Sequence, residues 1–220
     1  MYHYVTDKVF LKESYSICAD LVNQLVQRLK KYGIESKMSV VGSKKRGLVT
    51  QNEKEPIDYD FNLYIFKAPN INDARSIKQN VIKAFNEVLN WNDWGDCEDS
   101  TSAITTEKHA LTQGNKTPFS IDICIIKIDS FGNWHRLIHR KTGNMCFDQY
   151  YWNQGPKSKD IQKKEEFLKT NQQYWQEVMA AYLTKKNMYL SRQDVDGHPS
   201  FICYIESINE VYNKMNGAFS

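Results

Sequence analysis

The stretch "SVVGSKKRGLVTQNEKEPIDYDFNLYIF", residues 39–66, decides the prediction of the fold. An apolar run ends at a Gly-Ser pair, and a second apolar run then begins with Asp58 and Asp60. Residues two apart in a strand point to the same face, so these two aspartates share a face. The alternating residues take the opposite, core-facing side: Tyr59, Phe61, Leu63 and Ile65. The pattern predicts a strand over 58–66 with one apolar face and two carboxylates on the other.

A third carboxylate interrupts the most strongly predicted strand of the chain, "FSIDICIIKI" at 119–128. Asp122 lies among residues that favour burial, and an unpaired buried carboxylate is costly. The two-residue period places Asp122 on one face with Ser120 and Cys124. If this strand pairs with 58–66, the three carboxylates meet at one rim of the sheet.

Three carboxylates at one rim repel one another unless a cation neutralises them. At roughly 7 Å apart, Asp58 and Asp60 repel by about 2 kcal/mol at an effective dielectric near 20. Mg²⁺ prefers carboxylate and phosphate oxygens, and a carboxylate cluster can hold two metal ions roughly 3.5–4 Å apart for displacement at phosphorus. We therefore predict a Mg²⁺ or Mn²⁺ site made by Asp58, Asp60 and Asp122. Two alternatives stay open: edge-strand charges that prevent aggregation, or a salt bridge from Asp122 to a lysine or arginine.

The Gly-Ser pair supplies groups that bind phosphate. Gly42 lets the backbone approach a ligand closely, and backbone N–H groups together with the Ser43 hydroxyl can hold phosphate oxygens. Lys44, Lys45 and Arg46 follow directly and could add positive charge to a triphosphate. The alternative for these basic residues is an ordinary solvated loop.

The rest of the chain indicates an α+β protein with a mixed first half and a helical second half. Helices are predicted at 12–32, 70–90 with Asn72 or Asp73 as cap, 158–187 as one helix or a pair, and 198–215. Further strands are predicted at 37–43 and about 103–107, with a charged loop at 50–56 and loops from 129 through 156. The predicted domains are a palm at 1–130, connecting loops at 131–157 and a helical lobe at 158–220.

Composition excludes several classes of protein. The chain of 220 residues has 41% apolar residues and a net charge of +3, which is too small to indicate a nucleic-acid binder. No apolar run is long enough to span a bilayer, and the first residues lack the order of a signal peptide. Five scattered cysteines without a C-x-x-C pair suit reduced thiols, so we expect a cytoplasmic protein without a membrane partner. His135 and His139 stand four apart, but no Glu follows the first as in a zinc protease.

The order "VVGS", "RG", "DYD" and later "SIDI" resembles the nucleotidyltransferase superfamily with the DNA polymerase β-type palm. "GSKKRG" is similar to the G-S-x-x-R-G opening of the oligoadenylate synthetase and cGAS-like branch, which includes the bacterial CD-NTases. The specific match covers about 37–66 and 101–127. A later segment, "WNQGPKSKDIQKKEEFLKTN", is similar to the Trp…Pro…Asn segment that enters the helical half in that branch.

The resemblance implies a palm, a mixed sheet flanked by helices, followed by a small helical lobe packed on it. It also implies a metal-dependent nucleotidyltransferase (EC 2.7.7 type) that binds ATP or another NTP, moves a nucleoside monophosphate to an acceptor hydroxyl and releases pyrophosphate. By position, Gly42 and Ser43 would hold the triphosphate, with Lys44 and Arg46 beside it. Asp58 and Asp60 would bind the metals, and Asp122 would bind the metal that activates the acceptor.

Two departures from the pattern leave the acceptor open. Leu48 stands where that branch often has a threonine, and the helical half is short for a cyclic-oligonucleotide synthase. The acceptor could be a nucleotide, giving an oligonucleotide second messenger, or a protein, a tRNA or a small molecule. A third alternative is a palm-like module that binds nucleotide or RNA without turnover. One aromatic residue of the second half is expected to stack on a base, and the sequence does not indicate which.

Overall fold

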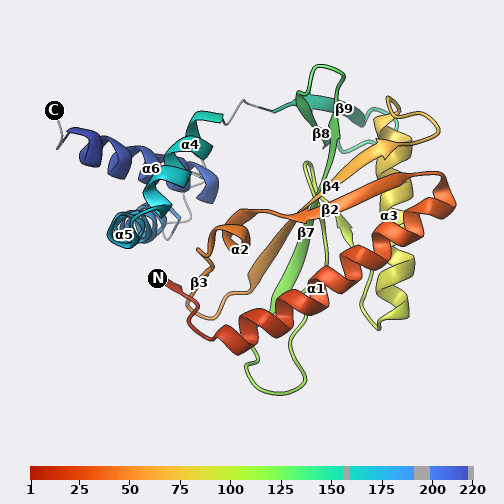
Figure 1. Ribbon diagram of the computed structural model, residues 1–220. Helices are drawn as coiled ribbons and strands as arrows, with labels where there is room; N and C mark the ends of the chain where they lie inside the picture. Colours follow the sequence, from red (N-terminus) through yellow and green to blue (C-terminus); the bar gives the residue numbers. More distant parts are fainter. Residues whose placement is uncertain (156–158, 191–198, 218–220) are drawn as a thin grey trace. The chain divides into compact units, whose positions relative to one another are not determined.

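The computed structural model describes residues 1–155, 159–190 and 199–217. The chain forms two compact units (Figure 1). The sheet unit comprises Thr6–Gly47 and Glu55–Gly155. The helical unit comprises Met1–Val5, Leu48–Lys54 and Pro156–Ser220.

The sheet unit is built on a seven-stranded mixed sheet, which confirms the predicted α+β class. Its strands follow the order β2-β4-β7-β6-β5, and β8 pairs with both β7 and β9. The β4–β7 pair is parallel, whereas the other strand pairs of this sheet are antiparallel. The bounds are β2 Glu35–Val40, β4 Ile57–Lys67, β5 Glu98–Asp99, β6 Ile104–Thr105, β7 Phe119–Ile128, β8 Trp134–Arg140 and β9 Gln149–Gln154.

The helices of this unit, α1 (Lys8–Leu29) and α3 (Ala74–Trp91), pack against one another (Figure 1). The core-facing residues predicted for β4 are all buried, with at most 2% of each residue exposed. Each helix begins at an aspartate cap: Asp7 accepts a hydrogen bond from Phe10 N, and Asp73 accepts one from Ser76 N, both at 3.0 Å. The cap at Asp7 explains why α1 begins four residues before the predicted start.

The prediction of loops from 129 through 156 was wrong, because β8 and β9 lie there and form a hairpin. Leu137 and His139 are the buried residues of β8. A strand pattern predicts an apolar residue at the second of these positions, and the histidine there hides the pattern. The charged loop expected at 50–56 is also partly wrong. Strand β3 (Thr50–Asn52) pairs there with β1 (Tyr2–Tyr4).

The helical unit contains α4 (Lys159–Lys169), α5 (Gln172–Tyr189) and α6 (Ser200–Gly217). Of the two alternatives for 158–187, the helix pair is the observed one: Asn171 caps α5 by accepting a hydrogen bond from Gln173 N at 2.9 Å. Position 158 and the first residue of the predicted 198–215 helix lie outside the described residues. The buried core of this unit is Leu48, Leu168, Val178, Tyr182, Cys203, Tyr204, Ile208 and Val211. Leu48, which stands where the related branch often has a threonine, therefore packs in this core.

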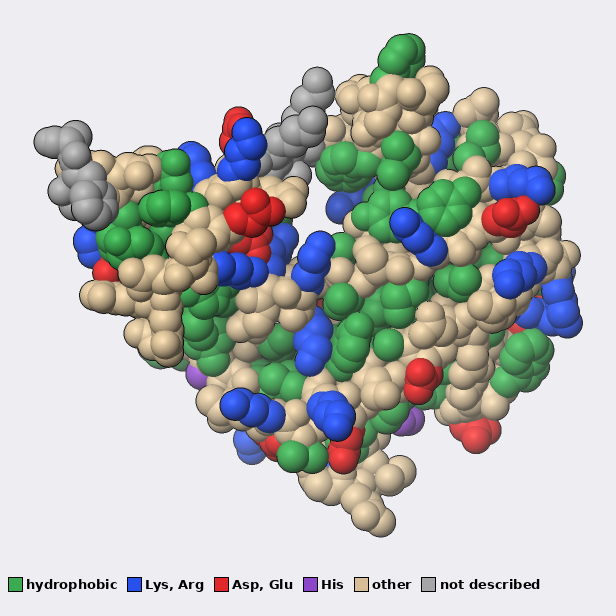
Figure 2. All heavy atoms as spheres, viewed as in Figure 1, with side chains coloured by type: hydrophobic (Ala, Val, Ile, Leu, Met, Phe, Trp, Pro, Cys, Tyr) green, Lys and Arg blue, Asp and Glu red, His purple; other side chains and the backbone are tan. Residues whose placement is uncertain are grey.

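The two units do not follow the predicted domain boundaries, since residues 1–5 and 48–54 group with the helical unit. The packing of the helical lobe on the palm stays a prediction. No helix in the described part of the chain has the length and apolar character needed to cross a membrane. On the face shown in Figure 2, acidic and basic side chains are interspersed with apolar ones, without a large patch of one sign.

Candidate active site

The parallel pairing of β4 with β7 brings the three aspartates onto neighbouring strands. Asp60 is the register partner of Asp122, and Asp58 is the register partner of Ser120. All of them alternate with buried apolar residues, so they share the face opposite those buried residues. The pairing of 58–66 with 119–128 that the sequence suggested is therefore confirmed.

The carboxylates are close enough to disfavour one another's charge. Burial raises the pKa of Asp60 to about 6, the charges of Asp122 and Asp58 add to this, and Arg46 and Arg136 oppose it. Burial, together with the charge of Asp58, also raises the pKa of Asp122. Among the described residues, the charges of Arg46 and Arg136 offset this effect only in part, since the pKa of Asp60 stays raised.

Hydroxyl groups contact two of the three acids. Ser120 Oγ donates to Asp58 Oδ1 at 2.5 Å, and Thr105 Oγ1 donates to Asp122 Oδ1 at 2.6 Å. Within the described residues, Asp122 accepts this hydroxyl bond and forms no salt bridge with a lysine or arginine, which was the alternative that the sequence left open. Each of these bonds engages one carboxylate oxygen and leaves the second oxygen as a further acceptor.

These side chains suit a hard divalent cation chemically, because they offer carboxylate oxygens. Within the described residues, however, no three His, Cys, Asp or Glu side chains are arranged as a metal-binding group. The structure thus places the acids on one face and in register, with mutual repulsion that a cation would relieve. The roles of Asp58, Asp60 and Asp122 as metal ligands remain a proposal.

The Gly-Ser segment lies directly against Asp60. Gly42 begins the short helix α2 (Gly42–Arg46) with a φ of +63°, a conformation that favours glycine. A Cβ atom at Gly42 would lie 2.0 Å from Asp60 Oδ2, so no larger residue fits without a shift of the carboxylate. Val41 N also donates to Asp60 O at 2.9 Å, which fixes the start of this segment to β4.

The basic residues that follow do not act as one group. Lys44 Nζ donates to the carbonyl oxygen of Leu11 at 3.1 Å and lies 4.9 Å from the centre of the Tyr15 ring. Lys44 is therefore directed toward α1, and burial lowers its pKa. Arg46, by contrast, is half-buried and lowers the pKa of Asp60 by its charge.

Sequence reasoning missed Arg136 and Thr105. Arg136 lies on β8 opposite Ile126, and its charge lowers the pKa of Asp60. Because this segment was predicted as a loop, its side chains could not be assigned to a face of the sheet. Thr105 lies in a strand of two residues, too short to show a period. Ser120 was placed on the correct face without a role.

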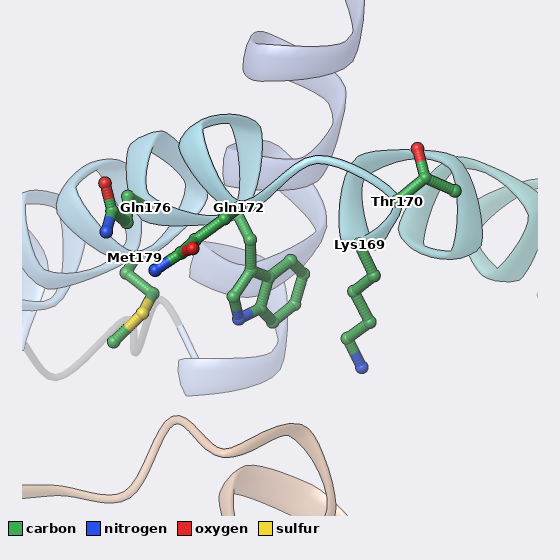
Figure 3. A pocket seen from close by; sticks show the side chains of 6 residues that line it. Lys169, Thr170, Gln172, Gln176 and Met179 are labelled. Carbon is green, nitrogen blue, oxygen red and sulfur yellow. The ribbon is translucent and has the colours of Figure 1, made fainter.

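A separate hollow lies on the helical unit, beside α4 and α5 (Figure 3). Lys169 Nζ lies 4.7 Å from the centre of the Trp175 ring and 2.6 Å from Glu165 Oε1. The hollow is lined by Lys169, Thr170, Gln172, Trp175, Gln176 and Met179. This lining offers aromatic, amide and hydroxyl groups but no carboxylate for a cation.

The fold is shared with solved structures of bacterial nucleotide-binding enzymes, although no protein-family model and no curated protein matches the chain. CdnC from E. coli MS115-1, solved with ATP, is 14% identical with a TM-score of 0.55, and the match covers 90% of this chain and 58% of CdnC. Vibrio cholerae DncV in its GTP-bound form is 12% identical with a TM-score of 0.55, covering 94% of this chain and 52% of DncV.

A further structure is described as the DncV cyclic AMP-GMP synthase in complex with the linear intermediate 5′ pppA(3′,5′)pG. It is 14% identical with a TM-score of 0.53, covering 88% of this chain and 52% of that one. The chain therefore has the fold of CdnC and DncV, which agrees with the fold that the sequence resemblance predicted. It spans between about half and three fifths of their length.

Proposed function

We propose that the protein is a nucleotidyltransferase that needs Mg²⁺ or Mn²⁺ and moves a nucleoside monophosphate from an NTP to an acceptor hydroxyl. The observation that carries the proposal is the register of β4 and β7, which puts Asp60 opposite Asp122 and beside Asp58. Gly42 packs against Asp60, so the segment proposed for phosphate binding adjoins the segment proposed for metal binding. The shared fold supports this assignment.

Each part of the site has a distinct task in the proposed reaction. Asp58, Asp60 and Asp122 would hold the cation, which neutralises phosphate charge when bound. The backbone at Gly42 and the Ser43 hydroxyl would bind the triphosphate, since such groups suit phosphate oxygens. The acceptor oxygen forms a bond to the α-phosphorus, the bond to the bridging oxygen breaks, and pyrophosphate leaves.

The acceptor hydroxyl must lose a proton in this step, and we propose Asp122 as the group that accepts it. Thr105 Oγ1 engages Oδ1 of this carboxylate, which leaves Oδ2 as a further acceptor. The Arg46 guanidinium carries a permanent charge close enough to affect Asp60, so it would also favour binding of the triphosphate. Lys44 would have to release the Leu11 carbonyl before it could contact phosphate.

ATP and GTP are the first donors to test, because CdnC and DncV have been solved with them. A linear dinucleotide intermediate in DncV makes a nucleotide the first acceptor to test, and the product would then be an oligonucleotide. Transfer to a protein, a tRNA or a small molecule is the second candidate. Mass spectrometry of incubated lysate for added nucleotide masses separates these two classes of acceptor.

The deciding experiment measures pyrophosphate release from each NTP with Mg²⁺ or Mn²⁺. The Asp58→Ala, Asp60→Ala double variant should lose the activity, whereas Asp20→Asn, an exposed aspartate of α1, should retain it. Equal turnover in the double variant and the wild type would reject the assignment. Triphosphate binding without pyrophosphate release, in wild type and variants alike, would favour the non-catalytic binding module.

A further inference from the structure

Two hydroxyl groups, those of Thr105 and Ser120, donate hydrogen bonds to the acids. The pairing of β6 with β7 determines the position of Thr105. Thr105 is the antiparallel register partner of Asp122, and its Oγ1 donates to Asp122 Oδ1 at 2.6 Å. A hydrogen bond to an ionised carboxylate is stronger than one between neutral groups, so it fixes the orientation of the carboxylate plane. Threonine is also stiff at χ1, which reduces the freedom of the donor itself.

We propose that Thr105 is a positioning residue for Asp122: its hydroxyl occupies Oδ1, so that Oδ2 is the oxygen offered to the divalent cation. Ser120 stands in the same relation to Asp58, since its hydroxyl donates to Asp58 Oδ1 at 2.5 Å. Groups that are hydrogen-bonded to metal ligands orient those ligands and affect the affinity of the site for the metal. The inference rests on the proposed function, because it concerns the cation which that function requires.

The short hairpin that carries Thr105 is held at its far end by contacts of Asp99 with two buried side chains, Lys78 and His139. Asp99 of β5 lies 2.5 Å from Lys78 Nζ of α3 and 2.7 Å from His139 Nδ1 of β8. Lys78 Nζ also donates to Ser100 O at 2.6 Å, and the side chain of Lys78 is only 2% exposed. Two other elements of the sheet unit therefore fix a strand of two residues, which alone would have little stability.

The network continues on the other side of His139, whose Nε2 lies 2.9 Å from Asp148 Oδ2. The backbone N of His139 donates to Thr101 O at 2.8 Å, which fixes the turn between β5 and β6. Both ring nitrogens of His139 are thus engaged by carboxylates, so the ring is held in one orientation. We infer that these contacts give β6 the fixed position that a positioning role for Thr105 needs.

Thr106 provides a matched control one residue away. Its hydroxyl accepts a hydrogen bond from Ile121 N at 2.9 Å, and its side chain is 4% exposed. Thr106 therefore contributes to the pairing of this segment with β7, and in the described part of the chain it makes no hydrogen bond to Asp58, Asp60 or Asp122. The substitutions Thr105→Val and Thr106→Val both replace a hydroxyl by a methyl group. Only Thr105→Val removes a hydrogen bond to a carboxylate, that of Asp122.

The test measures the affinity for Mn²⁺ alone, without nucleotide, by paramagnetic resonance and by the dependence of the melting temperature on Mn²⁺ concentration. We expect Thr105→Val to weaken Mn²⁺ binding about 10- to 100-fold, as is typical for loss of a partner behind a metal ligand. Thr105→Ser, which restores the donor, should recover most of the affinity. Thr106→Val should lower the melting temperature and leave Mn²⁺ affinity unchanged.

Thr105→Ala is measured in parallel, because it removes the hydroxyl without placing a methyl group against the carboxylate. Wild-type Mn²⁺ affinity in both Thr105→Val and Thr105→Ala would overturn the inference, even if pyrophosphate is released. A weakened affinity together with no pyrophosphate from any NTP would support the inference and reject the proposed function. Failure of the wild-type protein to bind Mn²⁺ would overturn both.

Discussion

Asp60→Asn should stabilise the metal-free protein while removing its proposed function. The pKa of about 6 for Asp60 lies about 2 above the ordinary value of 3.8. Each pKa unit corresponds to about 1.4 kcal/mol, so ionisation of Asp60 costs the folded protein about 3 kcal/mol near pH 7.5. Asparagine has nearly the same shape and no charge, and it should therefore raise the free energy of unfolding by about that amount.

The pH dependence has a defined sign. The pKa of Asp60 is higher in the folded protein than in the unfolded chain, so its favourable contribution is present below pH 3.8 and is lost as the pH rises through about 6. Wild type and Asp60→Asn should thus have similar stability near pH 4 and differ most above pH 7. Urea unfolding in EDTA between these pH values measures the difference.

Asp129 provides a control of opposite sign. Its pKa is lowered by hydrogen bonds from His135, the Asn133 side chain and nearby backbone N–H groups, so Asp129→Asn should destabilise the protein at neutral pH. Mg²⁺ should stabilise wild type and have less effect on Asp60→Asn, because the variant lacks one proposed ligand. If Asp60→Asn is no more stable than wild type at pH 7.5 in EDTA, then burial and the charges of Asp122 and Asp58 do not disfavour the ionisation of Asp60 as the structure requires.

Two further predictions concern the segment against the acids. Gly42→Ala should lower both stability and pyrophosphate release, because the new Cβ would lie 2.0 Å from Asp60 Oδ2; Gly114→Ala, which has a similar φ of +75° and no neighbour within 4 Å, should leave activity intact in the same two assays. Lys44→Gln should lower the melting temperature and change the KM for NTP little, because Lys44 contacts α1. Arg46→Gln should raise the KM for NTP more than Lys44→Gln does, because the charge of Arg46 acts on Asp60. Equal KM values for the two variants would contradict the separation of these side chains.

The strands that carry the acids could be predicted because their signal is local. Alternation in β4 assigns each residue to a face without knowledge of its neighbours. The register with β7 could not be read from alternation, since any shift by two residues keeps the same faces. The structure supplies that step by pairing Asp60 with Asp122.

The rest of the site depends on contacts between distant segments. Arg136 was missed because β8 carries a buried histidine, and His139 tolerates burial only through its two carboxylate partners. Lys44 was grouped with Arg46 by sequence position, but a carbonyl group of α1 determines where it points. Neither effect has a local signal, so neither could be found from composition or periodicity.

The arrangement of charge on the sheet favours a binding role over a purely structural one. If these acids had only a structural role, a neutral residue at position 60 would raise the free energy of unfolding by about 3 kcal/mol. The alternative that the charges prevent aggregation applies to solvated strands at the edge of a sheet. Asp60 is not at such an edge, because β7 pairs with it on one side and Val41 N donates to its carbonyl oxygen on the other. A bound ligand would explain why the charged residues are kept, if its binding free energy to the three carboxylates exceeds the stability that their charges cost. A divalent cation is the simplest ligand of that kind.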